Sequence, residues 1–160
     1  MRIAIVSDTH SRYATVEAAL KLIEERQAER ILHCGDIEDA DTIWLFPGTT
    51  HFVFGNCDVE RQSIRQAVYG IGASLHEPFG NLFLDGKSVA FVHGDDRRLF
   101  RQLEESDKYD YLFYGHTHVA AEHQTGRTRV INPGALHRAS KHTFLILDTD
   151  TGATETVVVE

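Results

Sequence analysis

The sequence predicts an α/β protein that folds as a four-layer αββα sandwich, with two mixed β-sheets packed together and flanked by helices. Two observations lead to this prediction. Short apolar strands alternate with helix-like segments in the first half of the chain, and the second half is richer in strands. Because the chain has 160 residues and no internal repeat, residues 1–160 are expected to form a single domain.

The first half reads as a strand–helix alternation, which is typical of parallel sheets. Apolar runs predict strands, and apolar residues at helical spacing predict a helix between the first two. The expected elements are, in order, a strand over 2–7, a helix over 13–28, a strand over 30–35, a helical segment over 39–46 and a strand over 50–55. Residues 57–80 are expected to form a specificity loop.

The second half contains seven expected strands and one helix. The helix is predicted over 97–106, within a second specificity segment at 94–108. Residues 84–88, LDGKS, and 148–153, DTDTGA, read as hairpin turns. The strands are expected within residues 81–86, 88–94, 109–115, 120–126, 128–134, 142–152 and 153–160.

Composition limits the classes of partner. The formal net charge of −8 weighs against sequence-independent binding of nucleic acid, because such binding relies on Lys and Arg residues that neutralise phosphates. The apolar run at the N-terminus is too short for a signal segment or a membrane span, so no membrane partner and a cytoplasmic location are expected. The two cysteines, Cys34 and Cys57, fit a reducing compartment rather than a disulfide framework.

Residues 114–120, YGHTHVA, place two histidines after an apolar run. If the strand continues through them, His116 and His118 point to the same side and could bind one metal ion. A polar strand end is the other interpretation of this short pattern, so the rest of the chain has to decide.

Polar side chains follow five of the predicted strands, where ligands collect in open α/β sheets. Each of them also has a purely structural explanation, because Asp and Asn cap helices and tolerate turns. Their coincidence at five strand ends is what favours a common site. The residues concerned are Asp8, His10, Asp36, Asn56, His93, His116 and His118.

These seven donors indicate a metal centre. Carboxylates, imidazoles and a carboxamide suit Mn²⁺, Fe or Zn²⁺ better than a soft-ligand site. Seven ligands exceed what one tetrahedral ion uses. Two divalent ions that share a carboxylate would use them all, and such a pair suits an in-line displacement at phosphorus.

The ordered motifs SDTH, CGDI, GNCD, VHGDD and YGHTH resemble those of the calcineurin-like metallophosphoesterase superfamily. The small size, together with GNCD and INPG, resembles the compact bacterial and archaeal phosphodiesterases of that group. The resemblance extends from Asp8 to Gly134, nearly the whole chain. It implies a hydrolase that binds two divalent ions, with Mn²⁺ as the first choice and Zn²⁺, Fe, Ni²⁺ or Mg²⁺ as alternatives.

The resemblance also implies a division of the ligands. Asp8, His10 and His118 would hold the first ion, Asp36 would bridge the pair, and the second ion would be held by Asn56, His93 and His116. A hydroxide between the ions would attack phosphorus, so no Ser or Cys nucleophile is required. Within this set, the candidate catalytic residues are Asp36, Asn56 and His93.

One position departs from the pattern of larger members, which carry GNHE and use its histidine to stabilise the transition state or protonate the leaving group. This chain has Cys57 and Asp58 there. A thiol is a poor substitute for an imidazolium donor, so a poorly activated alkoxide should be hard to expel. The small phosphodiesterases resembled here share the substitution, and the group that protonates the leaving oxygen stays open.

Charge arithmetic predicts a preference for diesters. Two dications, the carboxylates of Asp8 and Asp36, and a bridging hydroxide leave a net charge of about +1, which a phosphodiester monoanion balances and a monoester dianion exceeds. A small phosphodiester is therefore the expected substrate.

Four further residues are candidate substrate contacts. Arg97 and Arg98 could reach a phosphate as a charged fork, although a solvated helix start paired with nearby carboxylates is the alternative. Asn132 is expected to hold a turn near the site, and His137 is a candidate contact to a ligand or to the substrate.

Two other functions compete with a metal-dependent phosphodiesterase. The retromer subunit of the same fold resembles a phosphoesterase but acts mainly as a protein-interaction scaffold, which makes a binding module the first alternative. A nuclease or nucleotide phosphodiesterase is the second, with nucleic acid the less favoured partner given the acidic balance. The resemblance further suggests a homo-oligomer.

Overall fold

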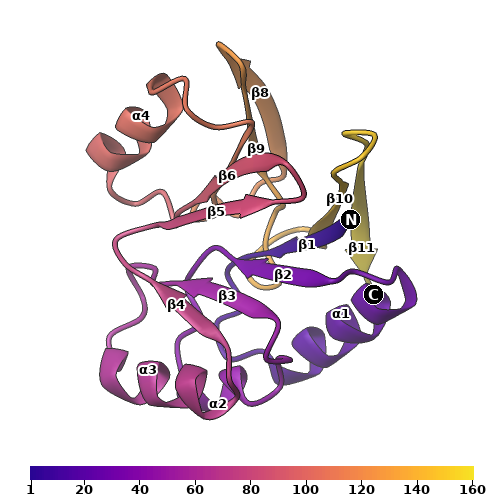
Figure 1. Ribbon diagram of the computed structural model, residues 1–160. Coiled ribbons are helices and arrows are strands. Elements are labelled where there is room, and N and C mark those ends of the chain that lie inside the picture. Colours follow the sequence, from indigo (N-terminus) through magenta and orange to yellow (C-terminus); the bar gives the residue numbers. More distant parts are fainter.

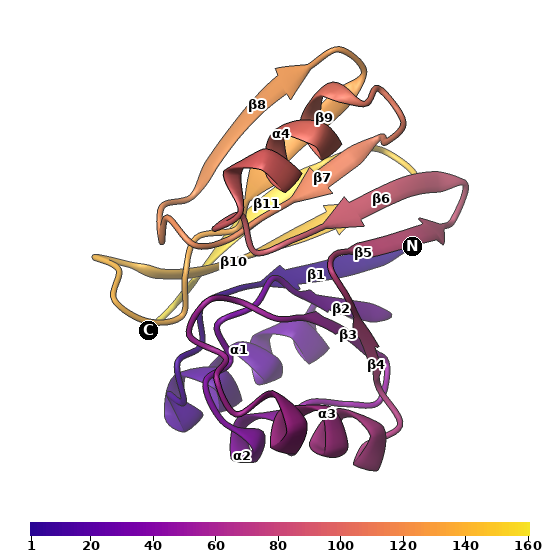
Figure 2. The ribbon, with the colours of Figure 1, turned by 90° about the vertical axis from the view of Figure 1, so that its left-hand side faces the viewer.

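The computed structural model describes all 160 residues, Met1–Glu160. Figures 1 and 2 show three helices on the outer face of one sheet, a second sheet stacked on its other face, and a fourth helix beyond the second sheet. The predicted four-layer αββα sandwich of two mixed sheets is confirmed.

The first sheet has six strands in the order β11-β10-β1-β2-β3-β4. Its four strands from the first half of the chain are parallel to one another. The strand–helix alternation predicts three of them, β1 to β3, and β4 is an addition. The two C-terminal strands add to it antiparallel. The bounds are β1 Arg2–Val6, β2 Arg30–His33, β3 Thr50–Val53, β4 Ser74–His76, β10 His142–Asp148 and β11 Thr154–Val159.

The second sheet has five strands in the order β5-β6-β7-β9-β8, of which β6, β7 and β9 are parallel. The predicted turn between β5 and β6 is present, with Asp85 and Gly86 at φ 49° and 77°, as a tight hairpin requires. The bounds are β5 Gly80–Leu84, β6 Lys87–Phe91, β7 Tyr111–Phe113, β8 Ala121–Thr125 and β9 Thr128–Asn132.

The helices are α1 Tyr13–Glu25, α2 Ala40–Ile43, α3 Arg61–Gly70 and α4 Arg97–Glu105. The segment predicted as helical over 39–46 is regular only in α2, where the Asp39 side chain accepts a hydrogen bond from the Thr42 N–H. It then continues in tighter i→i+3 turns through Phe46, because Pro47 prevents further helix.

The expectation of a loop over 57–80 is wrong, because this segment contains α3 and β4. The apolar face of α3 consists of Ile64, Ala67 and Val68, one short stripe on an otherwise polar helix without a side-chain N-cap. β4 is a three-residue edge strand whose side chains are all only partly buried. Both are held by packing on the first sheet more than by local sequence signals.

Three hydrophobic cores lie between the layers. One lies between helices α1 to α3 and the first sheet, one between the sheets, and one between the second sheet and α4. β1 contributes Ala4 and Val6 to the first of these and Ile3 and Ile5 to the second. Burial on both faces explains why β1 is continuously apolar.

None of the helices combines the length and the apolar character that crossing a membrane requires.

Candidate functional site

The seven candidate ligands lie at the carboxyl ends of five strands, as predicted. The parallel strands of each sheet end on the same side, and the stacked sheets bring those ends together. The ligands are Asp8 and His10 after β1, Asp36 after β2, Asn56 after β3, His93 after β6, and His116 and His118 after β7.

The backbone turns sharply at most of these residues. Five of the seven have left-handed φ values between 43° and 67°: Asp8, His10, Asp36, His116 and His118. Such values are uncommon outside glycine, although Asp and His tolerate them better than most residues, and they cluster at functional sites. Because the backbone turns at these residues, side chains that are close in sequence can lie together in the space beyond the strand ends.

The possibility that a continuing strand points the two histidines of YGHTH to one side is not realised. β7 ends at Phe113, and His116 and His118 lie in the following loop with φ of 67° and 60°. Their side chains reach different neighbours. His116 Nδ1 lies 3.1 Å from Asn56 Oδ1, and His118 Nε2 lies 3.0 Å from Asp8 Oδ1.

Asp8, His10, Asp36 and His118 form a first group, with ligand atoms all within 4.8 Å of one another. His10 Nε2 lies 3.8 Å from Asp8 Oδ1 and 3.6 Å from Asp36 Oδ2. His118 Nδ1 is 3.3 Å from the Arg138 carbonyl oxygen, which can only accept, so the lone pair of His118 is on Nε2, the atom beside Asp8.

Asn56, His93 and His116 form a second group beside the first. His93 Nε2 lies 2.9 Å from Asn56 Oδ1 and 3.2 Å from Asp36 Oδ2. His93 Nδ1 donates to the Cys34 carbonyl oxygen at 2.8 Å, so in the neutral, metal-binding form of His93 the lone pair is on Nε2. Asp36 Oδ2 therefore faces His10 of the first group and His93 of the second.

The residues fit divalent cations. Asp8 Oδ1 and His10 Nε2 are buried and have no hydrogen-bond partner, although an unpaired buried polar atom is costly. Two atoms that bind one ion at about 2.1 Å are separated by roughly 3 to 4 Å, which is the range of the distances above. The donor set of carboxylate, imidazole and carboxamide suits Mn²⁺, Fe or Zn²⁺.

The two carboxylates are held as anions. Burial opposes the ionisation of Asp36, but the adjacent His93 outweighs it and lowers the pKa of Asp36 to about 2. Burial likewise opposes the ionisation of Asp8, and the nearby His10 and the Ser7 hydroxyl bring its pKa below the usual value. In the metal-free protein, burial acts to lower the pKa of His93, yet Asp36 raises it to about 9.

Metal uptake should therefore tighten as the pH rises. His93 is protonated at neutral pH in the metal-free protein and must lose that proton to become a ligand, so apparent affinity should rise about tenfold per pH unit between about 6.5 and 9. Calorimetric Mn²⁺ titrations in buffers of different ionisation enthalpy would count the released protons. Affinity that is flat over this range would contradict the assignment.

The same shift has a consequence for the metal-free fold. The folded-state pKa of His93 lies above its usual value, so the His93–Asp36 pair stabilises the fold fully below about pH 6.5. This contribution is lost as the pH rises through about 9.

Asp58 holds the loops that carry Asp36 and Asn56, a role that the sequence reasoning missed. Its buried carboxylate accepts four backbone hydrogen bonds of 2.7 to 3.0 Å, from the N–H groups of Asp36, Ile37, Glu38 and Gly55. The ends of β2 and β3 are thereby tied to one side chain. In the sequence, the signal for this role is the aspartate two residues after Asn56 in GNCD.

His33 is a second missed support. It is fully buried, its Nδ1 accepts from the Gly35 N–H at 3.1 Å, and its Nε2 therefore donates to Thr9 Oγ1 at 3.1 Å. Burial lowers the pKa of His33 to about 3, so it is neutral. It links the turn that bears Asp36 to the turn that bears Asp8 and His10.

Gly115 allows the loop with His116 to approach β1 closely. A Cβ atom at this position would lie 1.9 Å from Ser7 Oγ and 2.7 Å from Asp8 Oδ2. The His116 N–H donates to that same Asp8 oxygen at 3.1 Å. Any side chain at residue 115 would displace Asp8 or separate the two loops.

Gly115→Ala is expected to lose metal at the first group and to destabilise the fold by about 1 to 3 kcal/mol. Metal content after dialysis and urea unfolding would measure both effects. Gly72→Ala is the matched control, because a Cβ there has nothing within 4 Å and only its φ of 73° resists the change. Equal metal content in the two variants would contradict the prediction.

Two of the candidate substrate contacts lie near the centre. The His137 ring is 5.5 Å from the His10 ring, and His137 Nδ1 accepts a hydrogen bond from Arg12 Nε at 3.2 Å. Asn132 is buried and its amide bonds to Gly115 O, Thr117 Oγ1 and the Gly134 N–H. Asn132 thus holds the loop that carries the two histidines, as expected, and both hydrogens of its amide group are used within the protein.

Arg97 and Arg98 are not brought to the centre. They are exposed on α4 and line a separate hollow with Arg101, Gln102 and Glu105, which contains none of the seven candidate ligands. They also make no ion pair, so the alternative of pairing with neighbouring carboxylates is not observed either.

The chain is similar to known phosphodiesterases and phosphoesterases in sequence and in fold. A phosphodiesterase of Methanocaldococcus jannaschii is 27% identical over the full length of both chains. The solved structure of an archaeal phosphodiesterase is 26% identical, covers 99% of each chain and superposes with a TM-score of 0.91. A phosphoesterase from E. coli shares the fold at 20% identity, with full coverage of both chains and a TM-score of 0.72.

The predicted enzyme class, a phosphoric ester hydrolase, agrees with a family match over nearly the whole chain. Residues 1–152 match the family model of the calcineurin-like phosphoesterase superfamily domain. Together with the strand-end ligands, this match shows that the chain belongs to the calcineurin-like phosphoesterase superfamily.

Proposed function

We propose that this protein is a dinuclear metal-dependent phosphodiesterase. The observation that supports two ions rather than one is the position of Asp36 Oδ2, which faces His10 Nε2 at 3.6 Å and His93 Nε2 at 3.2 Å. The other Asp36 oxygen accepts from the Cys57 N–H at 2.8 Å, so the carboxylate is fixed in this orientation. The relatives named as phosphodiesterases over the full chain length support a diester as the substrate.

The proposed ligands fall into the two groups that the distances between their side chains define. Asp8, His10 and His118 would hold one ion, Asn56, His93 and His116 the other, and Asp36 both. When bound, the ions supply Lewis acidity and lower the pKa of water so that hydroxide is available near neutral pH. We take Mn²⁺ as the first metal to test, because carboxylate, carboxamide and imidazole ligands suit it.

Leaving-group protonation is not supplied by a strong acid next to Asn56. Burial and the Asp36 carboxylate raise the pKa of the Cys57 thiol to about 11, so it stays protonated at neutral pH and is a weak donor. Diesters with good leaving groups should therefore react fastest. The charge arithmetic of two anionic carboxylates further favours a diester monoanion over a monoester dianion.

The test is hydrolysis of bis(p-nitrophenyl) phosphate by chelator-stripped protein with Mn²⁺ added back. Turnover should appear only with metal and should fall by roughly 100-fold or more in Asn56→Ala and in His116→Ala. Asn81→Ala and His123→Ala are the matched controls, because both residues are exposed on edge strands of the second sheet. Their turnover should equal that of the wild type.

Other outcomes would point elsewhere. A higher kcat/KM for p-nitrophenyl phosphate than for the diester would contradict the diester preference. No turnover with any divalent metal, in folded protein, would favour the protein-interaction module. Cleavage of oligonucleotides that weakens steeply with salt would favour a nuclease.

A further inference from the structure

A cavity of about 450 Å³ opens beside the second ligand group. His93 and Gly55 form part of its wall, and it lies where the end of β3, the start of α3 and the loop after β6 meet. Its volume falls in the range of sites that take small organic ligands. A group attached to a phosphorus at the centre would find space here.

Arg61 lines this cavity and is held in place by two contacts. Its Nε donates to the Asp58 carbonyl oxygen at 3.1 Å, and its guanidinium carbon lies 4.8 Å from the centre of the Phe54 ring. These contacts use the Nε hydrogen and one face of the guanidinium. The two Nη atoms make no hydrogen bond or ion pair with the protein, so they remain free as a charged fork for an anion.

The contact to Asp58 links this arginine to the proposed metal centre. The carboxylate of Asp58 binds the backbone of Asp36 and of Gly55, and its carbonyl oxygen binds Arg61. The guanidinium is therefore connected to the second ligand group through a residue that also positions Asp36. Preorganisation of this kind reduces the entropy lost when a ligand is bound.

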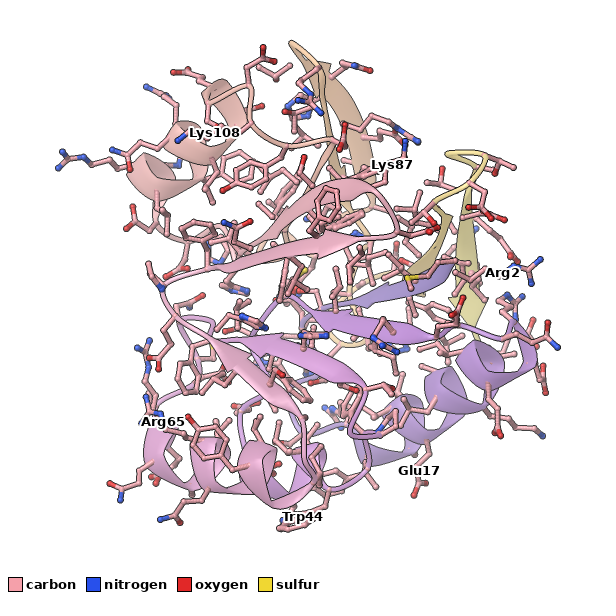
Figure 3. The ribbon with its side chains drawn as sticks, viewed as in Figure 1. Arg2, Glu17, Trp44, Arg65, Lys87 and Lys108 are labelled. Atoms are coloured by element: carbon pink, nitrogen blue, oxygen red, sulfur yellow. The ribbon has the colours of Figure 1, made fainter.

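The other arginines compared with Arg61 lack either an unpaired guanidinium group or a place in this cavity. Arg65, one turn further along α3, also lies over Phe54, at 5.6 Å, but its Nη2 is paired with Glu77 at 2.9 Å. Figure 3 labels it at the edge of the molecule beside α3 and β4. Arg97 and Arg98 line a different hollow. Arg61 alone combines a free fork with a place in the cavity that contains His93.

We propose that Arg61 is the substrate-binding arginine of this site and that its Nη atoms donate to a phosphoryl oxygen of the bound diester. The inference rests on the proposed function and gives Arg61 the phosphate contact for which Arg97 and Arg98 were the candidates. Asp95 and Asp96, on the wall of the same cavity, make no ion pair. They repel a second negative charge, so the arginine orients a monoanion without favouring a dianion.

The first arm of the test is binding without turnover. Inorganic phosphate is titrated calorimetrically into Mn²⁺-loaded wild type, Arg61→Ala, Arg61→Lys and Arg65→Ala. Loss of a charge-assisted fork should weaken phosphate binding about 10- to 100-fold in Arg61→Ala, and Arg61→Lys should recover only part, because an ammonium is not a fork. Arg65→Ala should bind phosphate as the wild type does.

The second arm is turnover of bis(p-nitrophenyl) phosphate by the same proteins. The KM of Arg61→Ala should rise by a similar factor, and added guanidinium ion at non-denaturing concentration should lower it again, an effect that a merely structural role would not produce. Unchanged phosphate binding in Arg61→Ala, an equal loss in Arg65→Ala, or a fall in Mn²⁺ content would overturn the inference. Absence of turnover in the wild type would instead contradict the proposed function. The phosphate titration would still test the role of Arg61 in binding.

Discussion

Asp36→Asn is expected to abolish hydrolysis of bis(p-nitrophenyl) phosphate, with kcat/KM falling by roughly 1,000-fold or more. The reason is that Asp36 Oδ2 is the one carboxylate oxygen that faces both ligand groups, toward His10 and toward His93. The variant keeps the size of the side chain but removes the negative charge. Mn²⁺ stoichiometry after equilibrium dialysis should drop together with the activity.

Asp41→Asn is the control for this experiment, because Asp41 is exposed in the first turn of α2 and makes no ion pair. It should retain activity and metal. An Asp36→Asn protein that still binds two equivalents of Mn²⁺ and still turns over the diester would show that the two groups do not share this ligand. A protein that loses both ions together with the activity would agree with a carboxylate that both ions share.

The strand ends were predictable because a parallel sheet imposes a simple rule. Apolar runs fix where strands lie, parallel strands end on one side, and polar residues directly after them must meet there. Asp8, Asp36 and Asn56 follow from this rule for the first sheet. His93 and His116 follow for the second sheet once the sheets are stacked.

Local geometry within the loops was not predictable in the same way. The period-2 rule for His116 and His118 fails because β7 ends at Phe113 and both histidines adopt left-handed backbone conformations. Those conformations are fixed by long-range contacts, such as the hydrogen bond from the His116 N–H to Asp8. A hydrogen bond across 108 residues leaves no periodic signal in the sequence.

Substrate contacts were the least predictable part. A pair of adjacent arginines at 97 and 98 is conspicuous in the sequence, but α4 lies beyond the second sheet (Figure 2). Both arginines line a separate hollow that contains none of the candidate ligands. Arg61 is inconspicuous because α3 was not recognised as a helix. Its position depends on Phe54 and Asp58, which lie before the helix and are brought beside it by the turn after β3.

Asp58 is the residue on which the geometry of the centre depends most without any proposed contact to metal. Its two oxygens accept the N–H groups of three consecutive residues, 36–38, and of Gly55. Buried donors that lose their acceptor cost about 1 to 3 kcal/mol each. Few single side chains in this fold satisfy as many buried backbone groups.

Asp58→Asn should destabilise the metal-free protein by about 3 to 5 kcal/mol in urea unfolding. An asparagine can keep Oδ1 toward Ile37 and Glu38, but its NH₂ group then faces the N–H groups of Asp36 and Gly55, which donate to Oδ2 in the wild type. Asp41→Asn should change the free energy of unfolding by less than about 0.5 kcal/mol.

Unfolding of Asp58→Asn in excess Mn²⁺ tests whether Asp58 acts by holding the loops rather than by contacting the metal. Metal binds only the folded state and should restore part of the stability of Asp58→Asn, because the ligands themselves are intact. The recovered protein should still show weaker Mn²⁺ affinity, since the Asp36 loop is no longer held. Destabilisation below about 1 kcal/mol would mean that the loops at the ends of β2 and β3 keep their conformation without this carboxylate, and that the positions of Asp36 and Asn56 are set by the sheets alone.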